Sequence, residues 1–227
     1  MSVIEAKNLS RIYQDGESTI HAVDKINLSV EAGEFTAIIG PSGSGKTTLL
    51  NLIGGLDSPS EGTVVVDGKE IHELRDNALI NFRLRHIGFV FQAYNLIPVL
   101  SAQENVEFIM LLQGQSAKER EARAKELLKA VGLENQMHKR PSELSGGQQQ
   151  RVAVARALAS KPSFVLADEP TANLDSKSTE DLLDIMHRLN KEEGITFLFS
   201  THDQRVIDRA ERLIYVEDGK IKSDTRQ

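Results

Sequence analysis

Cysteine is absent from the sequence of 227 residues. Its absence excludes disulfides, thiolate metal sites and cysteine nucleophiles, and it suits a reducing compartment. An excess of positive charge is absent as well, because 27 lysines and arginines stand against 33 aspartates and glutamates and leave a formal net charge of −6. Proteins whose main task is to hold DNA or RNA usually carry a basic surface. We therefore expect no nucleic-acid partner.

A long apolar run is also missing. No stretch approaches the roughly 20 apolar residues that cross a bilayer. The residues from Met1 to Asn8 lack the basic start and apolar centre of a secretory signal. We expect a soluble chain, which another protein would have to hold if it works at a membrane. Apolar residues make up 40% and charged residues 26% of the sequence, which is ordinary for a globular protein.

The first part of the chain has the pattern strand, loop, helix. Polar and apolar residues alternate through residues 23–30, which is typical of a half-buried strand. The apolar run from Phe35 to Ile39 predicts a fully buried strand that leads into a glycine-rich loop. Residues 63–67 predict a further strand, which ends in the turn dipeptide Asp67-Gly68. After the glycine loop, apolar residues recur at helical spacing; they are Leu49, Leu50, Leu52, Ile53 and Leu56.

The middle of the chain predicts helices. Ser116 and Glu119 have the spacing of a capping box, in which each side chain satisfies the backbone amide of the other residue. The helix that they open is expected to run through Val131, with charged residues on one side and apolar residues on the other. We expect a mainly helical insertion at about residues 75 to 141, with boundaries good to about four residues.

The last third returns to alternating strands and helices. Strands are predicted at residues 164–167 and 195–199, with a helix between them whose apolar face includes Leu182 and Leu189. Buried strands that alternate with helices indicate an α/β fold with a mostly parallel sheet covered on both faces. The polar tail, residues 223–227, is expected to be frayed.

The glycine-rich loop matches the phosphate-binding pattern G-x-x-x-x-G-K-[ST] at every fixed position. Glycines let backbone N–H groups turn inward around phosphates, and the next helix adds the positive end of its dipole. Lys46 would place a charge at the β- and γ-phosphates, and the Thr47 hydroxyl would ligate magnesium. An ordinary strand-to-helix turn is the alternative, but it would not require this lysine and threonine. The expected nucleotide-binding residues of the loop are Gly40, Pro41, Ser42, Gly43, Ser44, Gly45, Lys46, Thr47 and Thr48.

An acidic pair, Asp168 and Glu169, directly follows the predicted strand at residues 164–167. An acid at the carboxyl end of a parallel strand can hold magnesium, usually through water. A second carboxylate beside it can orient or deprotonate an attacking water. A strand that simply ends in exposed acids is the alternative. The phosphate loop upstream favours the catalytic interpretation.

A second glycine motif, Leu144 to Gln148, precedes a segment with helical spacing. Ser145 and Gln148 could act only as a capping box for that helix. The glycines between them weaken a first helical turn by about 1 kcal/mol each relative to alanine. They are better explained where a ligand approaches the backbone closely. We therefore expect Ser145, Gly146, Gly147 and Gln148 to form a second phosphate site, which serves the nucleotide of a partner subunit.

With these motifs in this order, the sequence resembles the nucleotide-binding subunits of ABC transporters over nearly its whole length. The resemblance implies a P-loop NTPase core with a mostly parallel sheet, an N-terminal antiparallel β subdomain and a helical insertion subdomain. It implies one domain over residues 1–227, with the core at about 1–74 and 142–227 and the helical subdomain at about 75–141. It also implies ATPase activity with ATP and Mg²⁺, and a head-to-tail homodimer with ATP between the phosphate loop of one subunit and the signature of the other.

The resemblance assigns roles to further positions. Tyr13 resembles the aromatic residue that stacks on adenine, and Gln92 resembles the loop glutamine that senses magnesium, the attacking water and the transporter. His202 resembles the switch histidine at the γ-phosphate, and residues 173–175 resemble the loop that crosses the dimer interface. Taken singly, Tyr13 could be a packing aromatic, and Gln92 and His202 could be polar residues at strand ends. The implied catalytic residues are Glu169, His202, Gln92 and Lys46, and the implied metal ligands are Thr47, Gln92 and Asp168.

The stretch from Phe91 to Val106 is similar to the LolD/MacB branch of the family, which serves lipoprotein release and the efflux of macrolides and peptides. That similarity implies a membrane permease as partner, and a place at the cytoplasmic face of the inner membrane through that permease. A groove for the permease's cytoplasmic helix is expected at Tyr94, Leu96, Ile97 and Leu100, with core packing as the alternative. Subunits of cell division and of amino-acid import share much of the same pattern.

Two other functions stay open at the level of sequence. One is an ATPase that acts on nucleic acid or the ribosome; the negative charge and the lack of a second cassette, a long coiled coil or a zinc module argue against it. The other is a binding switch with little turnover, such as a regulatory partner of cell-wall enzymes. The presence of Asp168, Glu169 and His202 argues for real hydrolysis instead.

Overall fold

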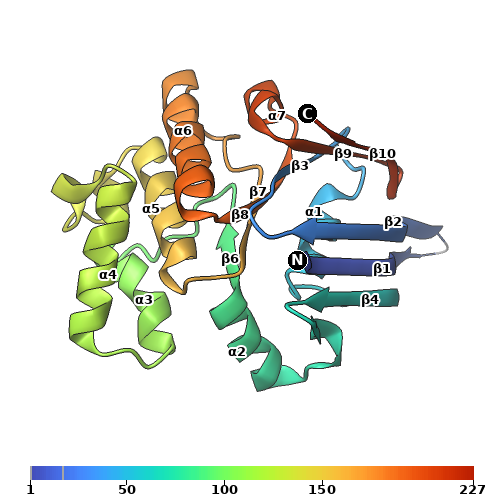
Figure 1. Cartoon of the computed structure of the whole chain (residues 1–227), viewed down its shortest axis with the longest axis horizontal. Helices are drawn as coiled ribbons and strands as arrows, with labels where there is room; N and C mark the ends of the chain where they lie inside the picture. Colours follow the sequence, from blue (N-terminus) through green and yellow to red (C-terminus); the bar gives the residue numbers. More distant parts are fainter. Residues whose placement is uncertain (1, 17) are drawn as a thin grey trace.

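The computed structural model describes residues 2–16 and 18–227. Its larger sheet has six strands in the order β10-β9-β3-β8-β7-β6 (Figure 1). Neighbouring strands from β9 to β6 run parallel, and β10 is antiparallel to β9. This arrangement confirms the predicted α/β fold with a mostly parallel sheet. The strands are β3 (Phe35–Ile39), β6 (Ile87–Val90), β7 (Phe164–Asp168), β8 (Thr196–Thr201), β9 (Arg212–Glu217) and β10 (Lys220–Arg226).

The smaller sheet is antiparallel and has the strand order β2-β1-β4-β5. Within β2, the buried residues Ile26, Leu28 and Val30 alternate with exposed ones, because one face of this sheet packs on the core and the other meets solvent. The predicted turn at Asp67-Gly68 joins β4 to β5. The strands are β1 (Ser2–Asp15), β2 (Ser18–Glu31), β4 (Glu61–Val66) and β5 (Lys69–Glu70).

The helices cover the larger sheet, with α3, α4 and α5 gathered at the end of the molecule opposite β1, β2 and β4 (Figure 1). The capping box of Ser116 and Glu119 is present at the start of α4, as predicted. Within the described ranges, no helix is both long and apolar enough to cross a membrane. The helices are α1 (Lys46–Ile53), α2 (Asp76–His86), α3 (Ala102–Leu112), α4 (Ala117–Ala130), α5 (Gly146–Ala159), α6 (Ser176–Glu193) and α7 (Gln204–Arg209), with single 3₁₀ turns at Ile71–Glu73, Glu134–Gln136 and Pro141–Glu143.

Two apolar clusters form the core, one on each face of the larger sheet. Phe197 and Phe199 of β8 belong to the cluster that contains α3, α4, α5 and α6. Leu198, between them, belongs to the cluster that packs α1 against the smaller sheet. Successive side chains of a strand point to opposite faces, so a fully buried strand requires cover on both. The continuous burial of β8 is the result.

One sequence expectation differs from the structure. The helices α2, α3 and α4 lie within residues 75–141, and the short strand β6 lies among them and pairs in parallel with β7, Ile87 opposite Phe164. Its apolar run is too short for a helix and suits a buried strand. The division of the chain into a core and a helical subdomain stays a prediction. The prediction of a frayed tail is wrong, because residues 223–226 belong to β10. Ion pairs hold this strand: Arg212 binds Asp224 at 2.7 Å, and Arg226 binds Glu34 at 2.8 Å.

Candidate functional site

The phosphate loop leaves β3 at Ile39 and enters α1 at Lys46, as the sequence predicts. Two of its glycines allow contacts that no other residue could. At Gly40 the backbone φ is +149°, and an added Cβ would lie 2.0 Å from the carbonyl oxygen of Val216. At Gly45 φ is +99°, and a Cβ would lie 2.0 Å from the carbonyl oxygen of Ala22. The loop is therefore held between β2 and β9 in a shape that requires glycine.

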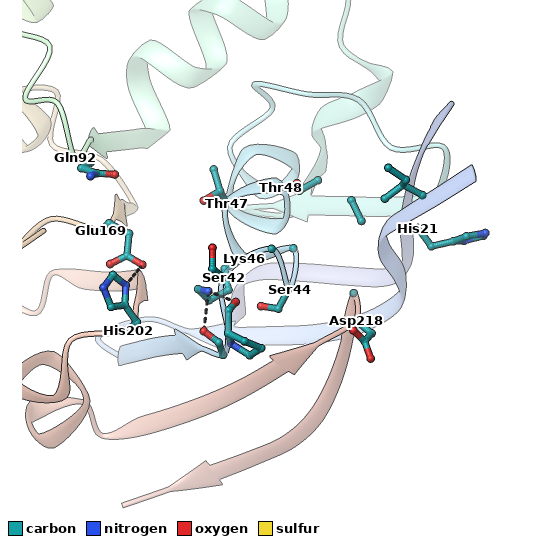
Figure 2. Close-up of a pocket in the computed structure, with 17 residues that line it drawn as sticks. His21, Ser42, Ser44, Lys46, Thr47, Thr48, Gln92, Glu169, His202 and Asp218 are labelled. Carbon is teal, nitrogen blue, oxygen red and sulfur yellow. Dashed lines mark hydrogen bonds and ion pairs between the residues drawn. The ribbon is translucent and has the colours of Figure 1, made fainter. Parts of the chain in front are cut away.

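Polar groups of this loop line the cavity in front of it, and they differ in how far their hydrogen bonds are satisfied. Lys46 is only 7% exposed, and its Nζ donates to the carbonyl oxygens of Gly40 at 2.9 Å and Pro41 at 2.8 Å (Figure 2). Ser44 Oγ is buried and has no hydrogen-bond partner within residues 2–16 and 18–227. The first turn of α1 has no side-chain cap. Its N–H groups are thus available to an anion.

The acidic pair lies beside the loop at the end of β7. Thr47 Oγ1 donates to Asp168 Oδ1 at 3.0 Å, which joins the loop to the strand end. Glu169 has a left-handed backbone, φ +45°, which is unusual outside glycine. Its Oε1 lies 2.8 Å from His202 Nδ1, and Figure 2 shows the two side chains facing each other beside the loop. Its Oε2 is buried and unpartnered in the described part of the chain.

The polar side chains beside the phosphate loop come from the ends of three neighbouring parallel strands. Gln92 follows β6, Asp168 and Glu169 end β7, and His202 follows β8. The carboxyl ends of parallel strands meet at one edge of the sheet, where ligands of such folds bind. The shared cavity has a volume of about 1010 Å³. Its lining includes every predicted residue of the phosphate loop, together with Gln92, Glu169 and His202.

Tyr13 and the second glycine motif lie elsewhere. Tyr13 donates its hydroxyl to Asp57 at 2.8 Å, and the Arg11 guanidinium lies 4.7 Å above its ring. Neither Tyr13 nor Ser145 to Gln148 belongs to the described lining of the cavity. Stacking of Tyr13 on a base stays a prediction, and it would use the ring face that Arg11 leaves open.

The second motif has the predicted capping box, with Gln148 N donating to Ser145 Oγ at 3.3 Å and Ser145 N donating to Gln148 Oε1 at 3.0 Å. Its glycines are tightly packed. A Cβ on Gly146 would lie 2.8 Å from the Tyr94 hydroxyl, and one on Gly147 would lie 2.7 Å from Ser178. Close packing within this chain is therefore a second reason for glycine here, beside the approach of a ligand.

Sequence reasoning missed several residues of the cavity. They come from β2 and from the turn between β9 and β10: Ile20, His21, Ala22, Asp218 and Gly219. The Asp218-Gly219 dipeptide is a turn signal, and it could have predicted the hairpin but not its position over the loop. The residues of β2 carry no such signal.

The fold and the loop together define a P-loop nucleotide-binding protein. The ABC transporter family profile matches residues 23–172, and the chain belongs to this family. It is 48% identical, over all of its length, to the macrolide export ATP-binding/permease protein MacB of Mannheimia succiniciproducens, of which it spans only 35%. It is 44% identical to the lipoprotein-releasing system ATP-binding protein LolD of Chromohalobacter salexigens, with 98% of this chain and 94% of that protein covered.

A solved structure gives the same fold. The ATP-binding cassette MJ0796, in a dimeric post-hydrolysis state bound to ADP and phosphate, is 46% identical to this chain with a TM-score of 0.90. The alignment covers 98% of each chain. MJ0796 comes from Methanocaldococcus jannaschii. Likeness at this level extends through the whole cassette, including the strand ends that carry the site.

Proposed function

We propose that this chain is the ATP-hydrolysing subunit of an ABC transporter of the LolD/MacB type, which dimerises head to tail and powers a membrane permease. The observation that carries the proposal is the pair of Glu169 and His202 at the phosphate-loop cavity, with one carboxylate oxygen held and the other left free. The similarity to MacB, LolD and an ADP-bound cassette supports it.

ATP binding would use the phosphate loop. Lys46 Nζ, which now donates to two loop carbonyls, would turn to the β- and γ-phosphates. Ser44 Oγ and the first N–H groups of α1 would donate to phosphate oxygens, which relieves the buried hydroxyl of its missing partner. Ile20 and Ala22 of β2 add apolar surface to the lining of the cavity.

Magnesium fits the donor set beside the loop. No group of three or more His, Cys, Asp or Glu that could hold a metal occurs among the residues described. A cation would therefore depend on the Thr47 hydroxyl, the Asp168 carboxylate, the Gln92 amide and phosphate oxygens, which are the oxygen ligands that Mg²⁺ prefers. When bound, Mg²⁺ neutralises the charge that develops on the transferred phosphoryl group.

Hydrolysis would depend on the free oxygen of Glu169. Oε1 is held by His202 Nδ1, and Oε2 is buried and unpartnered among the described residues. Rotation of the carboxylate would turn an unpaired oxygen toward the cavity, where it would accept a proton from the attacking water. His202, whose side chain is 73% exposed in the single chain, would then reach the γ-phosphate from the rim. Gln92, which lines the same cavity, would help to orient the water.

The proposed dimer rests on the separate positions of the phosphate loop and the second glycine motif. The P-loop cavity contains no residue of Ser145 to Gln148 within the described chain, so these residues do not complete the site of their own subunit. A second subunit turned head to tail would bring its Ser145 to Gln148 against the open side. Asn173, whose Nδ2 donates to the carbonyl oxygen of Gln92 at 3.0 Å, would lie near that junction.

The permease would dock in an apolar groove between α2, α3 and α5, with a volume of about 600 Å³. Of the four residues expected to form it, only Ile97 is in the described lining of the groove, and Tyr94, Leu96 and Leu100 are not. Leu96 packs on the core, and the Tyr94 hydroxyl donates to the carbonyl oxygen of Asn173 at 3.3 Å. A helix from a membrane protein would fill such a groove. Through it, the chain would sit at the cytoplasmic face of the inner membrane.

The test is the variant Glu169→Gln. It should bind ATP normally, lose at least about 100-fold in hydrolysis because the proton acceptor is gone, and accumulate as an ATP-bound dimer. Steady-state phosphate release and size-exclusion chromatography with ATP measure the two effects. Glu192→Gln, an exposed residue of α6, is the matched control and should keep the normal rate. Hydrolysis at the normal rate by Glu169→Gln would show that Glu169 has another role.

A further inference from the structure

The groove between α2, α3 and α5 carries positive charge and no described negative charge. Its charged lining residues are Arg83 from α2 and Arg156 from α5. No aspartate or glutamate occurs in the part of the lining that the structure describes. The rest is mostly apolar, and three of its members are exposed although large and apolar: Leu56 at 44%, Ile80 at 52% and Leu112 at 56%.

Arg156 is held in place by the chain itself. Its guanidinium donates to the carbonyl oxygens of Tyr94, at 2.8 Å, and Asn95. These two residues have left-handed backbones, φ +59° and +50°, so Arg156 stabilises a strained segment of the loop after β6. Burial lowers the pKa of the Arg156 guanidinium from its ordinary value. Arg156 therefore shapes one wall of the groove and adds to its positive field.

Arg83 has more donors to spare. Its Nη1 donates to the carbonyl oxygen of Gly55 at 2.7 Å, the one hydrogen bond of this side chain within the described part of the chain. Among the side chains that the structure describes, no carboxylate forms an ion pair with it, in contrast to Arg209 and Arg212, which each bind an aspartate. A guanidinium has five N–H donors in a rigid fork. Nε and Nη2 of Arg83 thus remain for an incoming acceptor, and the fork suits a carboxylate.

Filling the groove would take both arginines out of water. A cation that loses its water without a partner of opposite charge costs far more than burial of the apolar walls returns. An occupant that matched only the apolar walls would therefore bind poorly. We propose that the groove receives an apolar helix that carries one carboxylate, and that this carboxylate pairs with Arg83. The proposal deepens the proposed function, on which it rests, by giving the chemistry of the docking segment.

The test uses three synthetic peptides of about 18 residues, long enough to form a helix. They share an apolar face at positions i, i+4 and i+7 and differ only at position i+3, which is Glu, Gln or Lys. Fluorescence anisotropy measures their binding to the full chain and to the variants Arg83→Gln, Arg83→Lys and Arg85→Gln. Arg85 is exposed on the same helix and lies outside the groove, which makes it the matched control.

We expect the Glu peptide to bind the unaltered chain about tenfold more tightly than the Gln peptide, and the Lys peptide to bind least. Arg85→Gln should keep this order. Arg83→Gln should reduce the preference for Glu to less than about twofold, and Arg83→Lys should retain part of it, because the charge remains but the fork is lost. Equal binding of the three peptides to the unaltered chain, or no binding of any at about 1 mM, would overturn the proposal.

ATP hydrolysis is measured on the same preparations. A preference for the Glu peptide that depends on Arg83, in a chain that does not hydrolyse ATP, would support the groove assignment and refute the proposed function. Normal hydrolysis without any preference for the Glu peptide would do the reverse. The two hypotheses thus fail separately.

Discussion

The Asp203 side chain caps α7 and connects two loops. Its Oδ1 accepts from the backbone N–H of Arg205 at 3.0 Å and so caps α7. Its Oδ2 accepts from Arg205 Nη2 at 2.7 Å and from Thr171 Oγ1 at 3.0 Å, which ties the loop after β8 to the loop after β7. Hydrogen bonds from the Arg205 guanidinium hold the pKa of Asp203 below its ordinary value.

The depressed pKa of Asp203 makes part of the stability depend on pH. The folded state favours the ionised carboxylate, so this contribution is complete above the unfolded pKa of about 4 and is lost as pH falls through the folded pKa. Asp203→Asn should lower the free energy of unfolding by about 1 kcal/mol at pH 7, because asparagine still caps but cannot pair with Arg205. The difference from the unaltered chain should shrink as pH falls below about 4.

Urea unfolding at several pH values measures this difference. Asp181→Asn, an exposed residue of α6, should cost less than about 0.5 kcal/mol. A loss at Asp203→Asn that stayed the same down to about pH 2 would mean that the ion pair with Arg205 does not cause it.

Many of the residues that line the cavity were named from the sequence, and those that were missed share one cause. The residues from Gly40 to Thr48, with Gln92, Glu169 and His202, line one cavity because each follows a strand of the same parallel sheet. For β3, β7 and β8 a local apolar run predicts the strand, whereas the roles of Gln92 and His202 were inferred from the family resemblance. His21 and Asp218 were not predicted, because they reach the cavity only through the packing of β2 and the β9–β10 hairpin over the loop. That packing joins segments far apart in the sequence and leaves no local pattern.

Among the strands and helices, β6 was the hardest to predict for a similar reason. Its four residues lie between α2 and the helices α3 and α4, so their surroundings in the sequence indicate helix. Pairing with β7 decides their conformation. For the C-terminal strand β10, the polar composition predicts a frayed end, but the structure shows a strand. Ion pairs from Arg212 and Arg226 to Asp224 and Glu34 supply order that apolar burial does not.

The contact between β6 and α5 gives a prediction about packing. A Cβ on Gly88 would lie 2.6 Å from the carbonyl oxygen of Ala157, so the helix backbone crosses the strand at the closest approach that glycine allows. Gly88→Ala would force α5 away from the sheet, and it should lower the free energy of unfolding by about 2 to 3 kcal/mol. Urea unfolding measures the loss.

Gly114→Ala is the control for this substitution. There φ is +80°, and an added Cβ would meet no described atom within 4 Å, so only backbone strain is introduced, at a cost of about 1 kcal/mol. If Gly88→Ala costs no more than Gly114→Ala, α5 does not approach β6 as closely as described.

For the assembled protein, the separation of the two glycine motifs makes a quantitative prediction. Lys46→Ala removes the charge that grips phosphate. Gly146→Asp places a carboxylate where the phosphates of a partner's nucleotide would lie, and an acid at this position also suits the start of α5, so the helix should persist. The Cβ added at position 146 would come too close to the Tyr94 hydroxyl, but this group is the end of a side chain that can move. Each variant alone should lose hydrolysis.

Mixed in equal amounts, the two variants should recover about a quarter of the activity of the unaltered protein. Half of the dimers are then hybrids, and each hybrid has one site built from an intact phosphate loop and an intact signature. The reciprocal experiment mixes the unaltered chain with the double variant Lys46→Ala/Gly146→Asp. Here both sites of a hybrid are broken, so only dimers of unaltered chains work, and phosphate release should fall to about a quarter rather than a half. No recovery in the first mixture and a half in the second would mean that Gly146 serves the nucleotide of its own subunit. The motor would then be the single chain and not the pair.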